Sequence, residues 1–114
     1  TTPSMVADGI RLVTDTAIGH GRTIDPEHFG ALVPFVHGTL PDRFADRIRT
    51  RQPDLDPREV VAPGIAGLRA RLEAFVSAGA SKFVVFPLDE PPGGPAAWHA
   101  TIEDVAAECL PLQD

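Results

Sequence analysis

One stretch decides the fold class of this chain: Ala78-Gly79-Ala80-Ser81-Lys82-Phe83-Val84-Val85-Phe86-Pro87-Leu88. Its central run, from Phe83 to Phe86, is continuously apolar and rich in β-branched and aromatic residues, so it predicts a β-strand. Because no polar residue alternates along this run, we expect both faces of the strand to be covered, as in a parallel sheet. Helical patterns stand before and after the strand. This alternation of helix and strand is typical of an α/β protein.

A second buried strand is predicted upstream, where an apolar segment follows His28. The two strands are expected at about residues 29–36 and 82–88, and they should be parallel. Pro34 lies inside the first of them and has no N–H to donate to a ladder of hydrogen bonds. We therefore expect Pro34 at the end of the strand, at a bulge or at a sheet edge.

The remaining apolar patterns predict about five helices. Thr2-Pro3 and Asp56-Pro57 are pairs of an N-cap residue and a first-turn proline, and Gly79 marks a helix end. The helices are expected near residues 3–18, 41–50, 57–61, 65–78 and 96–109. For the last helix the predicted buried stripe consists of Trp98, Ile102, Val105, Ala106 and Leu110.

Size and composition limit the classes of function. The chain has 114 residues, a length suited to one domain spanning 1–114, and 43% of them are hydrophobic. Its net charge of −6 argues against a nucleic-acid footprint and against a basic membrane-binding face. No apolar run approaches the roughly 20 residues that span a bilayer. The single cysteine, Cys109, suits a reducing cytoplasm and is interpreted as a small apolar residue in a helix.

Candidate site residues follow the two predicted strands, where α/β folds place their ligands. They are His37 and Gly38 after the first strand and Leu88 and Asp89 after the second. The alternative for each is an ordinary loop residue in solvent. Gly64 lies at a predicted helix N-terminus, which either binds an anion or simply starts the helix.

Other chemistry is not indicated by the sequence. The four histidines do not stand at metal-ligand spacings, so no metal site is expected. Motifs for a nucleophilic serine, a P-loop or a dinucleotide fold are not found, and no catalytic residue is identified. Two parallel strands do not form an independent core, so we expect either partner chains or the rest of a larger domain.

Several segments, in the same order, resemble luciferase-like oxidoreductases that depend on flavin or deazaflavin (F420). These segments are Asp25-Pro26-Glu27-His28-Phe29-Gly30-Ala31-Leu32-Val33-Pro34-Phe35, Arg51-Gln52-Pro53-Asp54-Leu55-Asp56-Pro57, Leu72-Glu73-Ala74-Phe75-Val76, Gly79-Ala80-Ser81-Lys82-Phe83-Val84-Val85, and the last helix to Gln113. The resemblance covers nearly the whole chain. It implies the C-terminal part of a (β/α)8 barrel, which typically needs about 250 residues.

The resemblance also implies an activity. The family, which includes monooxygenases, transfers hydride to or from F420 or FMN, and most cofactor contacts come from earlier strands. The chain alone is therefore expected to bind no cofactor and to be inactive. Self-association, with strands of two copies completing a shared sheet, is expected to cover its exposed apolar surface. The alternatives are a small non-enzymatic α/β interaction module, and an independent enzyme with His37 as acid or base.

Overall fold

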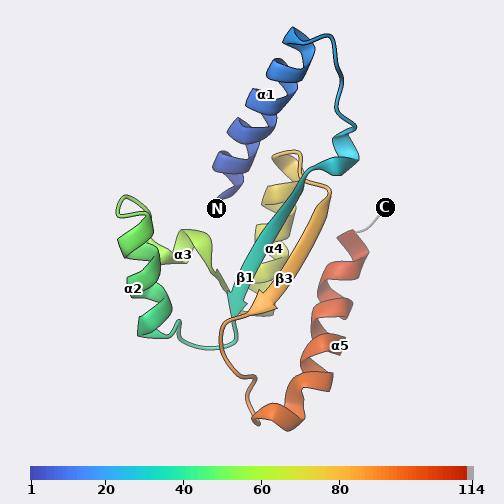
Figure 1. Cartoon of the computed structure of the whole chain (residues 1–114). Helices are drawn as coiled ribbons and strands as arrows, with labels where there is room; N and C mark the ends of the chain where they lie inside the picture. Colours follow the sequence, from blue (N-terminus) through green and yellow to red (C-terminus); the bar gives the residue numbers. More distant parts are fainter. Residues whose placement is uncertain (113–114) are drawn as a thin grey trace.

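The computed structural model describes residues 1–112, which form five α-helices and a three-stranded parallel sheet (Figure 1). The α/β class is therefore confirmed. The helices are α1 (Pro3–Gly19), α2 (Asp42–Arg51), α3 (Pro57–Val60), α4 (Gly64–Ser77) and α5 (Trp98–Cys109). The strands are β1 (Gly30–Val36), β2 (Ala62–Pro63) and β3 (Lys82–Pro87). Single turns of 3₁₀ helix lie at Pro26–His28, Pro95–Ala97 and Leu110–Leu112.

The two predicted strands are neighbours and run parallel. β1 pairs with β3 from Gly30 opposite Lys82 to Phe35 opposite Pro87. β2 pairs with the other edge of β1 only at its end, and the strand order is β2-β1-β3. β2 was not predicted, because a strand of two residues leaves no periodic pattern and Pro63-Gly64 suggests a break in the chain.

Pro34 lies inside β1, the middle strand, opposite Phe86, and not at the strand end, bulge or sheet edge that was predicted. The carbonyl oxygens of Phe29 and Phe35 both accept hydrogen bonds from the β3 side of the sheet. Alternate residues of a parallel strand bond to opposite neighbours, so Pro34 points away from β3. On that side β2 pairs only with Phe35 and Val36, and the missing N–H of Pro34 therefore breaks no ladder.

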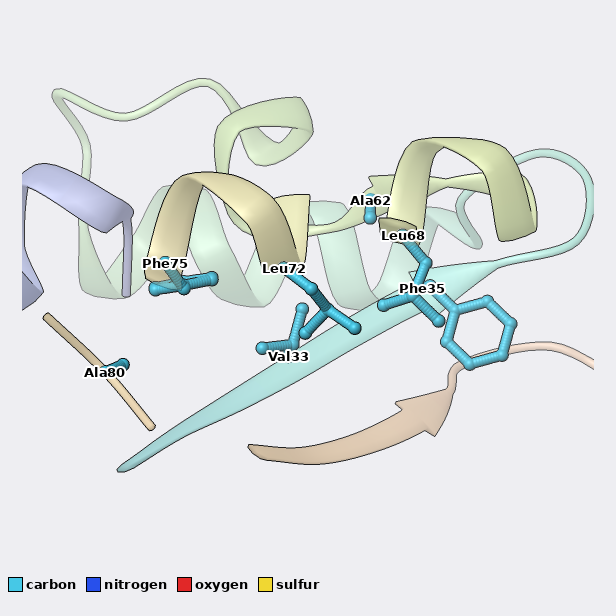
Figure 2. Close-up of a cluster of buried hydrophobic side chains, with 7 residues drawn as sticks. All are labelled: Val33, Phe35, Ala62, Leu68, Leu72, Phe75 and Ala80. Atoms are coloured by element: carbon cyan, nitrogen blue, oxygen red, sulfur yellow. The ribbon is translucent and has the colours of Figure 1, made fainter. Parts of the chain in front are cut away.

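The core lies between the sheet and α4 (Figure 2). Leu68, Leu72 and Phe75 of α4 point toward Val33 and Phe35 of β1, and all five side chains are buried. Ala62 and Ala80 complete the buried cluster. Val6 of α1 and Val105 of α5 pack against its margin, so α1, α4 and α5 contribute to one side of the sheet.

The opposite face of the sheet is exposed along the first part of β1 and β3, so within the described residues the expected cover on both faces is missing there. Leu32 is 62% exposed and Val84, its partner across the strands, is 59% exposed. α4 lies behind β1 and β3 in Figure 1, and no helix lies in front of them. An apolar strand is suited to burial on both faces, but its sequence does not show whether this chain contains a second layer of helices to cover them.

The predicted stripe of α5 is also partly wrong. Ile102 is 65% exposed and Leu110 is 55% exposed, whereas Thr101 is buried. The helix is rotated so that Thr101, Val105 and Cys109 face the rest of the molecule. Burial and the neighbouring Glu108 raise the pKa of the Cys109 thiol, in agreement with a packing role for this residue.

Local signals at the helix ends are confirmed. Thr2 Oγ1 accepts a hydrogen bond from the N–H of Met5, and the Asp56 side chain accepts one from the N–H of Arg58. Gly79 has a φ of 108°, a conformation that favours glycine, and ends α4 just before β3.

Candidate functional site

The candidate site lies where β1 and β3 end at the same edge of the sheet. His37 follows β1 and Asp89 follows β3, so parallel pairing brings residues 52 positions apart into contact. The Asp89 carboxylate accepts hydrogen bonds from the backbone N–H of His37, at 2.9 Å and 3.1 Å, and from that of Gly38, at 3.0 Å. His37 Nδ1 lies 3.1 Å from Asp89 Oδ1. One carboxylate therefore ties the two strand ends together.

Asp89 is held in its charged form. Its partial burial alone raises its pKa, but the hydrogen bonds from the His37 and Gly38 backbone and from the His37 ring outweigh that effect. The pKa of Asp89 is therefore lowered below its ordinary value. Because an ionised carboxylate can only accept hydrogen bonds, His37 Nδ1 must carry the proton in this contact.

The other ring nitrogen of His37 faces α5. Nε2 lies 3.4 Å from the hydroxyl oxygen of Thr101, and with the proton on Nδ1 a neutral ring accepts a hydrogen bond there. The His37 side chain is only 8% exposed. Its ring packs 5.3 Å from that of Phe35 and 6.3 Å from that of Trp98, centroid to centroid. These contacts fix both the orientation and the tautomer of the imidazole.

An open cavity of about 340 Å³ adjoins this histidine. Gly64 and Ile65, at the start of α4, form one wall, and His37 and Thr101 form another. The remaining lining residues are Pro91, Pro92, Ala97, Ala100 and Asp104. α4 has no side-chain cap and no acidic residue in its first turn, so its first N–H groups have no capping side chain. The start of α4, the His37 ring and the Asp104 side chain therefore all border this cavity.

The structure brings the predicted site residues to one end of the sheet, where they make different kinds of contact. His37, Gly38 and Asp89 are directly hydrogen-bonded, and Gly64 shares the cavity with His37. Leu88 contributes through its backbone, since its N–H donates to the Phe35 carbonyl oxygen at 2.9 Å. That contact continues the pairing of β3 with β1 up to the site.

Thr101 was missed by sequence reasoning, which placed it off the buried stripe of the last helix. Only the rotation of α5 brings its hydroxyl to His37. The resulting series of carboxylate, imidazole and hydroxyl can accept or donate one proton at a fixed position, as general acid–base chemistry requires. The described residues hold no group of three or more His, Cys, Asp or Glu arranged to bind a metal ion.

No protein family, curated protein or solved structure matches this chain in the three comparisons made. Within residues 1–112, none of the helices has the length and apolarity needed to cross a membrane.

Proposed function

We propose that this chain is the C-terminal portion of a luciferase-like oxidoreductase that transfers hydride with F420 or FMN. The observation that carries this proposal is the one-sided sheet. β1 and β3 are parallel and covered by α4 on one face, while Leu32 and Val84 lie bare on the other.

A one-sided parallel sheet suits a barrel wall. In a (β/α)8 barrel the helices form an outer ring, and the inner face is packed with branched apolar side chains from the other strands. Leu32 and Val84 are side chains of this kind and lie directly opposite each other. A doubly wound sheet would instead need helices on both of its faces.

The order of the strands limits which elements can belong to the barrel. Barrel strands pair in sequence order, whereas here β2 lies on the far side of β1 from β3. β2 has two residues and pairs only with the last two residues of β1. We therefore assign β1 and β3 as the last two barrel strands and treat β2 as an addition beside the end of β1.

The candidate site would form one edge of the cofactor or substrate pocket. In barrels, ligands bind at the carboxyl ends of the strands, and here His37, Gly38, Leu88 and Asp89 follow those ends. Gly64 adds a helix N-terminus of the kind that binds anionic groups. The cofactor would supply the hydride chemistry, and these residues would orient it and could accept a proton at His37 Nε2. The chain alone is proposed to be inactive, and its lone thiol suits the cytoplasm.

Titration with cofactor tests this proposal. The product of the complete gene should bind F420 or FMN saturably, measured by the fluorescence of either cofactor, and residues 1–114 alone should bind neither up to high micromolar concentration. His37→Ala should weaken binding by the complete product up to about tenfold through one lost hydrogen bond. His99→Ala is the matched control, because the His99 side chain is 86% exposed on α5. A complete product that binds neither cofactor, or a gene that encodes no further β/α units, would refute the proposal.

The same bare face favours a second candidate, a small α/β interaction module without enzymatic activity. A continuous exposed apolar surface commonly marks a contact with another protein. In either case the isolated chain is proposed to self-associate, with Leu32 and Val84 covered by another copy.

Light scattering on the purified chain tests self-association. The expected result is a dimer or larger assembly that Leu32→Glu dissociates, because a charge buried in an apolar contact is costly. Ile18→Glu should leave the assembly unchanged, because Ile18 is exposed on α1 away from the sheet. A well-folded monomer for the unmodified chain would argue against this surface as a contact.

A further inference from the structure

A second concave surface lies at the other end of the sheet from His37. It is a groove of about 700 Å³ between the C-terminal half of α1 and the segment that leads from α1 toward β1. In Figure 1 this segment turns back at the end of α1 and descends to the start of β1. The groove shares no lining residue with the cavity at His37. It is therefore a separate candidate for a ligand.

The walls of this groove are mainly apolar. Leu12, Val13, Thr16 and Ala17 of α1 form one side and Ile24 the other. Leu12 is 69% exposed and Ile24 is 37% exposed, so these side chains are not covered by the rest of the described chain. The volume lies within the roughly 300–1,000 Å³ range of small-molecule sites, which are mostly apolar with a few polar groups.

The basic side chains of the groove are His20 and Arg22. Among residues 1–112 no acidic side chain lines the groove, and Arg22 forms no ion pair with any of them. This is notable in a chain whose net charge is −6. A guanidinium in this position can take a carboxylate through two parallel hydrogen bonds, and the imidazole can donate a third.

We propose that this groove binds a free medium-chain carboxylate, with the acyl chain against Leu12, Val13 and Ile24 and the head group at Arg22 and His20. The apolar walls and the two basic side chains together select a ligand that is apolar along its length and anionic at one end. This proposal does not depend on the barrel assignment or on a cofactor.

The test uses octanoate as the probe and octanol as its uncharged counterpart. In a titration followed by amide NMR signals, octanoate should shift the signals of residues 12–24 saturably, with a Kd below about 1 mM. Octanol should bind more weakly because it offers no charge to Arg22. Arg22→Ala should weaken octanoate binding about fivefold, the effect expected for one exposed ion pair. Leu12→Glu should abolish binding, because it replaces an apolar wall by a repelling carboxylate.

Two matched variants serve as controls. Ile18→Glu lies on the same helix and is similarly exposed, but Ile18 does not line the groove. Arg51→Ala removes an exposed arginine from α2. Both should bind octanoate as the unmodified chain does. Absence of saturable shifts, equal affinity for octanol, binding retained in Leu12→Glu, or a groove already closed by a second copy would each overturn the proposal.

Discussion

Replacing Phe35 by alanine is expected to lower the free energy of unfolding by about 3–5 kcal/mol. Phe35 is 1% exposed, belongs to the core under α4, and its ring also packs 5.3 Å from that of His37. The substitution removes a large apolar side chain and leaves a cavity that the sheet cannot close. Domains of this size are stabilised by only about 5–15 kcal/mol, so the variant should lie near the limit of folding. Urea unfolding followed by circular dichroism measures the change.

Two further substitutions allow this prediction to be tested even if Phe35→Ala does not fold. Phe35→Leu preserves part of the volume and should remain folded with a smaller loss. Leu32→Ala is the matched control, because Leu32 lies on the same strand but is 62% exposed on the opposite face. It should change the free energy of unfolding by no more than about 0.5 kcal/mol in the monomer. A loss at Leu32 equal to that at Phe35, measured at concentrations where the chain is monomeric, would contradict the one-sided core.

Replacing Asp89 by asparagine is expected to cost about 3 kcal/mol of the free energy of unfolding near neutral pH. The Asp89 carboxylate accepts hydrogen bonds from two backbone N–H groups and from His37 Nδ1, and hydrogen bonds to a charged group contribute about 1.5–3 kcal/mol each. Asparagine has one acceptor oxygen instead of two and no charge, so it can replace only part of this set. Glu90→Gln, next to the site and exposed, is the control and should have little effect.

The loss at Asp89 should depend on pH in a defined direction. The folded protein lowers the pKa of Asp89, so the ionised carboxylate favours the folded state. This contribution is fully present above the unfolded pKa of about 3.9 and disappears as the pH falls through the lower folded pKa. The stability difference between the unmodified chain and Asp89→Asn should therefore be constant near neutral pH and shrink below about pH 4. A difference that stays constant down to pH 2 would mean that Asp89 acts through its shape and not through its charge.

The two substitutions act on one structural unit. Phe35 supports His37 from the core side, and Asp89 holds it from the end of β3. Loss of either contact should release the imidazole from its orientation toward Thr101. Any proton transfer at His37 Nε2 would therefore depend on residues that need not contact a ligand.

Part of the candidate site could be predicted from the sequence because parallel strands end at a common edge. That rule placed His37, Gly38, Leu88 and Asp89 together, and the direct contact between His37 and Asp89 follows it. The sequence did not show that Asp89 caps two backbone N–H groups, because those bonds depend on the path of both loops. Thr101 could not be found either, because its place depends on how α5 is rotated against α4 and the sheet.

The sequence by itself determined the local structure of this protein. Thr2 and Asp56 cap helices through hydrogen bonds to residues two or three positions on, and Gly79 ends a helix through its own backbone conformation. The structure confirms these helix ends. The apolar runs likewise fixed the two long strands and the α/β class. Only the tertiary structure decided which face of the sheet is covered, that Ala62–Pro63 joins β1 as a third strand, and that Thr101 meets His37. These features arise from contacts between distant segments, and the free energy of such contacts depends on the positions of both partners, which no local pattern contains.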